Sequence, residues 1–224
     1  MPEKEVRELV AAASRVALNN GKLIEIRMSQ SSDHLLEWLN FLESDKTGTA
    51  DAMLDGVRAG IAEATSSLIL ALVRPCMFSM RAQIDMLFSW IYFKDHRIEW
   101  DKVDTSLEDF ILPSVVLKYL NKYSTNFTDS MKLLTKHKTR LCEPYSLLSE
   151  HVHSQSLSAI PAVTKLAAVV QPDFIDDCFK LQADVSEYLS DVLLSWKLDR
   201  WTSLPEAIVK SVSTRLGDDL PALF

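Results

Sequence analysis

The chain has 224 residues, of which 47% are hydrophobic and 25% are charged, and its formal net charge is −7. These values are typical of one globular domain and exclude general disorder. The acidic balance disfavours a binder of duplex nucleic acid, which usually carries a basic stripe, although a local basic face stays open.

The pattern of hydrophobic residues predicts an all-α fold, a multi-helix bundle of about eight to ten helices in a single domain over residues 1–224. Only five glycines are present, whereas all-β folds need many tight turns. The first predicted helix covers residues 3–19 and ends at Asn19-Asn20-Gly21. A second is predicted to begin at the cap-forming residues Ser31, Ser32 and Asp33, so residues 1–48 are a possible N-terminal helical appendage.

The helices predicted at the centre of the bundle begin at residue 50. A helix over residues 50–73 carries Gly56 and Gly60 four positions apart, a spacing that lets another helix approach closely. The next helix, residues 75–93, starts at Pro75 and is apolar on nearly every side. We therefore expect it to be the buried central helix.

Five further helices are predicted toward the C-terminus. One covers residues 105–123 and is interrupted or started at Pro113, and a short one covers 127–137. Another follows Pro144, a long one spans 173–198, and Ser203 is predicted to cap the last, which runs from Pro205 to Leu216.

The location expected for this chain is cytoplasmic, without contact to a membrane. Its first residues contain no apolar signal core, and the longest apolar run, residues 68–73, is far too short to span a bilayer. Cys76, Cys142 and Cys178 are scattered and show no metal-ligand spacing, so reduced, mostly buried thiols are expected. The sequence indicates no metal site and no cofactor.

Several catalytic motifs are absent from the sequence. It contains no P-loop, no glycine fingerprint for dinucleotides, no nucleophile elbow and no HExxH. These absences favour a non-enzymatic role.

One pair of segments could still carry chemistry. Arg81 and Asp85 share a face of the central helix, and Tyr145, Ser149 and His153 share a face of a later helix, because each set has four-residue spacing. Two hypotheses follow from this pattern. Either the charges pair and hydrogen-bond to hold two helices in register, or they form a polar pocket with His153 exchanging a proton and Arg81 binding an anion.

The segments Arg81-Ala-Gln-Ile-Asp85 and Tyr145-Ser-Leu-Leu-Ser149-Glu-His-Val-His153 resemble HEPN-like helical proteins of prokaryotic toxin and phage-defence loci, over roughly residues 60–160. The resemblance implies a helical bundle, often dimeric, and sometimes a metal-independent endoribonuclease. It implies catalytic roles for Arg81, Asp85, Ser149 and His153. The Arg–His pair of active HEPN nucleases, spaced a few residues apart on a late helix, is not found near His151 or His153.

Two other groups of residues are candidates for binding. The local basic cluster could contact RNA or an acidic protein, or it could be a solvated helix end; it consists of Lys132, Lys136, His137, Lys138 and Arg140. Trp196 and Trp201 flank residues 197–200 and could form an apolar edge for a protein partner.

The leading functional hypothesis is a non-enzymatic interaction or accessory subunit of a bacterial defence or toxin–antitoxin system, with a protein partner or a homodimer. The first alternative is an HEPN-like metal-independent endoribonuclease that uses His153 with Arg81 and acts on RNA. The second is a helical regulator that binds a small molecule at Arg81.

Overall fold

The structure is a computed structural model, and it describes residues 3–106, 110–154 and 164–224. These residues form nine α-helices: α1 (Glu3–Leu42), α2 (Asp51–Ile69), α3 (Val73–Phe93), α4 (Arg97–Ser106), α5 (Pro113–Tyr123), α6 (Phe127–Lys136), α7 (Pro144–His153), α8 (Ile175–Trp196) and α9 (Glu206–Leu216). Five short 3-10 helices join them: η1 (Glu43–Asp45), η2 (Leu166–Val169), η3 (Pro172–Phe174), η4 (Leu198–Ser203) and η5 (Gly217–Leu223). Within these ranges no strand occurs, so the predicted all-α multi-helix bundle is confirmed.

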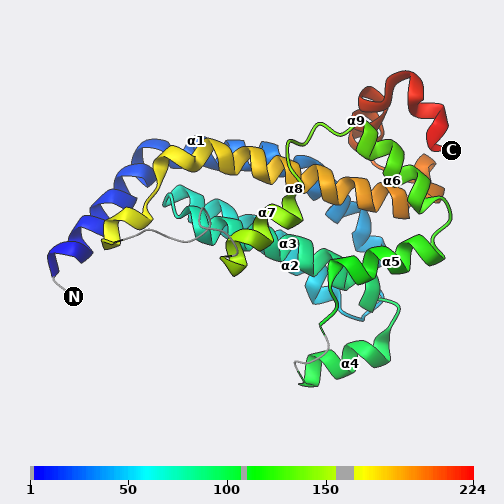
Figure 1. The fold of residues 1–224 in the computed structure, drawn as a ribbon, viewed down its shortest axis with the longest axis horizontal. Coiled ribbons are helices and arrows are strands. Elements are labelled where there is room, and N and C mark those ends of the chain that lie inside the picture. Colours follow the sequence, from blue (N-terminus) through cyan, green and yellow to red (C-terminus); the bar gives the residue numbers. More distant parts are fainter. Residues whose placement is uncertain (1–2, 107–109, 155–163) are drawn as a thin grey trace.

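Helix α3 lies in the middle of the bundle, between α2, α5, α7 and α8 (Figure 1). It is buried along most of its length, as its sequence predicts, and Leu87 and Phe88 are fully inaccessible to solvent. Helix α8 is buried on even more of its surface, including Leu189 and Val192. These two helices are the apolar centre on which the other elements pack.

The close approach predicted at Gly56 and Gly60 is confirmed. Both glycines face α3, and a Cβ atom built on Gly60 would lie 3.3 Å from the carbonyl oxygen of Ser79 and 3.0 Å from Cγ of Gln83. A Cβ atom on Gly56 would meet Sδ of Met86 at 2.5 Å. The absence of a side chain at these positions therefore sets how closely α2 and α3 pack.

Helix α1 is one continuous element, so the predicted break at Asn19-Asn20-Gly21 and the predicted caps at Ser31–Asp33 are wrong. Gly21 is buried, with its ideal Cβ position 3.5 Å from Cγ2 of Ile69 on α2. Ile24 and Met28 are buried on the same face one and two turns later. Their burial outweighs the cost of a glycine in a helix, about 1 kcal/mol relative to alanine.

Two details near the C-terminal half also differ from the prediction. The sequence pattern did not reveal α4, which precedes α5 as a separate helix, although α5 does begin at Pro113. Ser203 does not cap α9, because its Oγ donates to the carbonyl of Arg200 at 2.9 Å and α9 begins only at Glu206. A hydroxyl that closes the preceding turn in this way is no longer available for the next helix.

The N-terminal part of α1 reaches past the other helices of the bundle, with the segment around η2 lying beside it (Figure 1). From Val16 onward α1 contributes to the same apolar core as α3 and α8. None of the helices in the described ranges combines the length and the apolar character that a bilayer span requires.

Candidate functional site

The structure brings four of the proposed site residues together where α3 meets α7. Arg81 forms an ion pair with Asp85, and its Nε donates to Oγ of Ser149 at 3.1 Å. Its guanidinium lies 4.0 Å from the centroid of the Tyr145 ring. We call this group the Arg81 junction: Arg81, Asp85, Tyr145 and Ser149.

The Arg81 junction is a packed contact between two helices. The Arg81 side chain is only 10% exposed, and its charge is compensated by the Asp85 carboxylate, the Ser149 hydroxyl and the Tyr145 ring face. An incoming anion would have to displace these partners. The arrangement therefore fits the hypothesis that these residues hold α3 and α7 in register.

His153 lies at the last position of α7, and its side chain is exposed. Among the described residues, the contacts of Arg81 do not include His153. Arg74 closes this end of the helix, because its Nη2 donates to the carbonyl of His151 at 3.0 Å and to Oγ of Ser154 at 2.9 Å. Within the described residues, His153 and Arg81 therefore make no direct contact.

Every side chain of the basic cluster has a carboxylate partner. The pairs are Lys132–Asp129, Lys136–Asp219, His137–Asp219, Lys138–Glu143 and Arg140–Asp191. Hydrogen bonds from Lys136 and His137 also hold the pKa of Asp219 below its ordinary value. The pairing weakens the positive field that a phosphate backbone would meet.

The two tryptophans proposed as an apolar edge are both half-buried, and they pack against different aromatic residues. Trp196 packs edge-on against Trp90, with ring centroids 6.1 Å apart, and Nζ of Lys197 lies 3.7 Å from its centroid. It also lines a hollow of about 310 Å³ together with Tyr119 and Tyr123. Trp201 instead packs edge-on against Phe224, with ring centroids 5.2 Å apart.

A buried charge network on α8 was missed by the sequence analysis. Arg140 Nη1 donates to Oδ2 of Asp191 at 2.7 Å and to Oε1 of Glu187 at 3.2 Å, and Arg215 of α9 pairs with both of these carboxylates. Asp191 is fully buried. Asp184, two turns before Asp191, accepts from the backbone N–H groups of Leu141 and Cys142.

Burial and pairing compete in this network. Burial raises the pKa of Asp191 above its ordinary value, although Arg215 and Arg140 act to lower it. At Glu187 burial also acts to raise the pKa, but the Thr139 hydroxyl and the backbone N–H groups of Arg140 and Thr139 outweigh it, and the pKa is lowered. Burial, with Asp184 nearby, raises the pKa of the Cys142 thiol to about 12, so this thiol is not a nucleophile at neutral pH.

A signal for the network was present in the sequence. Asp184, Glu187 and Asp191 recur on one face of a helix whose other positions are mostly apolar. Charges in such a helix require buried partners, as Arg81 did. Their partners, however, come from a loop and a helix that no local spacing connects to α8.

A wide hollow in the described part of the chain lies beside this network. A cleft of about 1000 Å³ opens between α1, α8, α9 and residues 137–141. Its lining includes Trp38 of α1, Glu187, Ser190 and Asp191 of α8, and Arg215 of α9.

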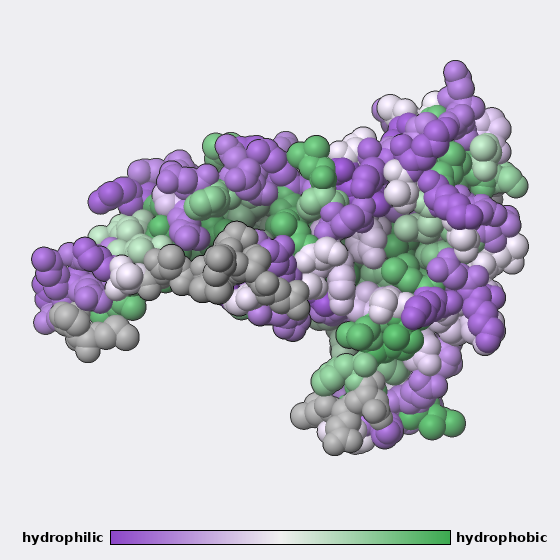
Figure 2. Space-filling model, in the orientation of Figure 1, coloured by the Kyte–Doolittle hydropathy of each residue, from purple (hydrophilic) through white to green (hydrophobic). Residues whose placement is uncertain are grey.

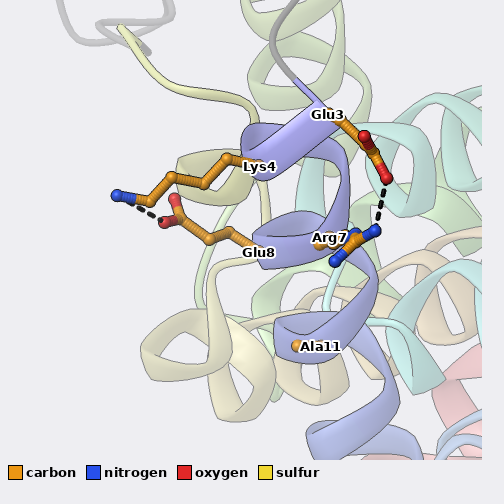
Figure 3. A pocket seen from close by; sticks show the side chains of 5 residues that line it. All are labelled: Glu3, Lys4, Arg7, Glu8 and Ala11. Atoms are coloured by element: carbon orange, nitrogen blue, oxygen red, sulfur yellow. Dashed lines mark hydrogen bonds and ion pairs between the residues drawn. The ribbon is translucent and has the colours of Figure 1, made fainter.

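A shallow hollow on the N-terminal part of α1 has a different character (Figure 3). All five lining residues, Glu3, Lys4, Arg7, Glu8 and Ala11, come from this one helix. The ion pairs Arg7–Glu3 and Lys4–Glu8 run along its surface. Such exposed ion pairs contribute little to the stability of the fold. The hollow has no opposing wall to hold a ligand.

The residue types that bind metal ions do not gather into a site within the described ranges, where no group of three or more histidine, cysteine or carboxylate side chains is placed to hold one ion. Comparison of the chain with protein-family models, with curated proteins and with solved structures gave no match.

Proposed function

We propose that this protein is a non-enzymatic interaction or accessory protein that uses the N-terminal part of α1 to bind a protein partner or a second copy of itself. The observation that carries the proposal is the exposure of Val6 and Val10. Both residues continue the core-facing side of α1, yet their exposed fractions are 47% and 58%.

The geometry of α1 explains why this exposure matters. Val6, Val10, Ala13 and Ala17, which we call the α1 stripe, recur every three or four residues. The same periodicity leads on to Gly21, Ile24 and Met28, which are buried. The stripe therefore has the pattern of a helix face that packs against protein, but it lies where α1 extends past the other helices (Figure 1).

A second apolar surface supports a role in interaction. At the start of α5, Phe110, Leu112 and Val115 are 72%, 57% and 45% exposed. Figure 2 shows apolar side chains gathered over this part of the molecule. Large exposed apolar areas on a folded protein commonly mark sites of protein–protein contact.

The state of the proposed catalytic residues also supports a non-enzymatic role. Arg81 is engaged by three neighbours within the bundle, and His153 is exposed at the end of α7. A role in a defence or toxin–antitoxin system is proposed because the Arg81 and Tyr145 segments resemble HEPN-like proteins. The ribonuclease alternative stays a prediction, and its test is cleavage of total RNA in EDTA by the wild type and by His153→Ala.

The α1 stripe is tested with the double variant Val6→Glu/Val10→Glu, compared with Leu18→Glu. Leu18 is 86% exposed and lies on another face of the same helix, so this change places a glutamate on α1 without touching the stripe. Sedimentation equilibrium measures the mass in solution, and co-expression with neighbouring genes measures retention of a partner. We expect the double variant to lose the complex and Leu18→Glu to keep it.

The opposite result is equally informative. If the double variant keeps the mass and the partner of the wild type, the α1 stripe is not the binding surface. If the wild type is monomeric, retains no partner and cleaves RNA in a manner that His153→Ala abolishes, the ribonuclease alternative replaces the proposal.

A further inference from the structure

The cleft between α1, α8 and α9 has the size of a ligand site. Its volume of about 1000 Å³ lies at the upper end of the range for small-molecule pockets in proteins, roughly 300–1,000 Å³. Much of its lining is apolar, including Trp38, Leu141, Ala183, Ala207, Ile208 and Val212. It is built by three helices of the fold, and it is separate from both the α1 stripe and the Arg81 junction.

Two polar groups that line the cleft are buried without a partner. Trp38 is fully inaccessible to solvent, and its Nε1 makes no hydrogen bond within the described residues; the buried Oγ of Ser190 on α8 makes none there either. Solvent reaches neither atom, so both lie behind the surface that the cleft presents to a ligand. The exposed part of this wall is apolar, with Leu141, Ala183 and Ala207 on it.

The carboxylates of the cleft are already satisfied. Asp191 and Glu187 are held by Arg140 and Arg215, and Asp184 accepts two backbone N–H groups. These acids therefore do not offer free acceptor positions to a cationic ligand. They fix the wall of the cleft by tying α9 and residues 139–142 to α8.

The cations at the opening of the cleft are less engaged. Lys210 of α9 is exposed and no ion pair with it is found among the described residues, and Lys180 of α8 pairs only with Asp177, at 3.0 Å on the solvent-exposed surface. Two exposed ammonium groups attract an anion to the opening. The interior thus offers apolar surface, and the rim offers positive charge.

We propose that this cleft binds a small organic anion, with its apolar body against Leu141, Ala183 and Ala207 and its acidic group toward Lys180 and Lys210. The acidic group is a carboxylate, a sulfonate or a phosphate, since all three suit a lysine at the rim.

The probe for this proposal is anilinonaphthalene sulfonate, an apolar anion whose fluorescence rises on burial. Binding of the uncharged N-phenylnaphthylamine measures the apolar contribution without the charge. We expect saturable binding of one sulfonate probe per chain, and weaker binding of the uncharged probe. Inorganic phosphate should not compete, because it lacks an apolar body.

Two variants locate the binding in the cleft. Ala183→Trp fills it from the exposed edge of α8 and should abolish saturable binding, whereas Ala62→Trp, at an exposed position on α2, should not. Lys210→Glu should weaken binding of the sulfonate probe about fivefold and leave the uncharged probe unaffected, whereas Lys118→Glu on α5 should change neither. Far-UV circular dichroism checks that each variant is folded.

The proposal is overturned if the wild type shows no saturable binding, or if binding survives Ala183→Trp. Binding that is lost in Val6→Glu/Val10→Glu and kept in Ala183→Trp would place the probe on the α1 stripe and would also overturn it. Because the two surfaces are tested with different variants, loss of one function leaves the other intact.

Discussion

Arg140 and Asp191, 51 residues apart in the chain, form a buried ion pair in which Nη1 donates to Oδ2 at 2.7 Å. The side-chain exposures are 2% and 0%. The pair joins the segment after α6 to the C-terminal half of α8, and Arg215 brings α9 to the same carboxylate.

Removing one partner of this pair should be strongly destabilising. Arg140→Ala leaves Asp191 buried with only Arg215 opposite, and we expect the free energy of unfolding to fall by about 3 to 5 kcal/mol. Lys138→Ala, two residues earlier, breaks a more exposed pair with Glu143 and should cost less than about 1 kcal/mol. Urea denaturation measures both, and equal losses would contradict the structural role given to Arg140.

The Arg81 junction predicts a contrast between two serines of α7. Ser149→Ala removes the hydroxyl that accepts from Nε of Arg81, and a lost hydrogen bond to a charged group should cost about 1 to 2 kcal/mol. Ser146→Ala, at an exposed position on the same helix, is the control and should change stability by less than about 0.5 kcal/mol. Thermal unfolding followed by circular dichroism separates the two; a cost at Ser146 that equals the cost at Ser149 would count against the junction.

The two glycines of α2 should respond differently to alanine. At Gly56 the new methyl group meets the flexible end of Met86, which can move, so the gain in helix propensity, about 1 kcal/mol, offsets the crowding. At Gly60 it meets the carbonyl of Ser79 and the buried Gln83, whose amide exchanges hydrogen bonds with Gln182. Overpacking there should make Gly60→Ala destabilising by about 1 to 3 kcal/mol. Chemical denaturation of the two variants side by side is the measurement, and the opposite ranking would show that α2 and α3 can shift apart.

Asp45 predicts a change of stability in acid. Burial acts to raise its pKa, but hydrogen bonds and charges from Lys197 and Arg200 outweigh burial and hold the pKa below the ordinary value. A carboxyl group whose pKa is lower in the folded state contributes stability above the pKa of the unfolded state, about 3.9, and loses it as the pH falls through the folded value.

Asp45→Asn should therefore lower the free energy of unfolding at neutral pH by about 1 to 2 kcal/mol. The difference from the wild type should shrink below about pH 4 and vanish once the wild-type carboxyl is protonated. Unfolding curves at a series of pH values give this difference directly. A difference that stays constant down to the lowest pH would mean that the charge of Asp45 does not carry the effect.

A structural feature could be predicted from the sequence when the residues that produce it lie close together in the chain. In the Arg81 junction, Arg81 and Asp85 are one helical turn apart, and so are Tyr145 and Ser149. These two pairs could be predicted from spacing, whereas the contact between α3 and α7 could be seen only in the structure. The helix over residues 75–93 was predicted from its apolar character alone. The glycine spacing predicted a close helix approach at Gly60, and the structure shows that the partner is α3.

The features that were missed depend on distant partners. The continuity of α1 rests on Gly21 packing near Ile69 of α2, which overrides the stop signal of Asn19-Asn20-Gly21. Arg140 looked like one member of a basic cluster, yet it is the one whose side chain is turned into the core toward Asp191. No spacing within α8 or α9 indicates that Arg215 would meet the same carboxylate, and so the cleft beside it could not be foreseen.

The continuity of α1 has a mechanical consequence. Forty residues at 1.5 Å rise give a helix about 60 Å long, and its two ends take part in different surfaces. The α1 stripe lies near the first turns, while His34 and Trp38 line the cleft some six turns later. Both surfaces share one uninterrupted helical backbone. A rotation or tilt of α1 at one end therefore also moves the other end, so the α1 stripe and the cleft wall change orientation together.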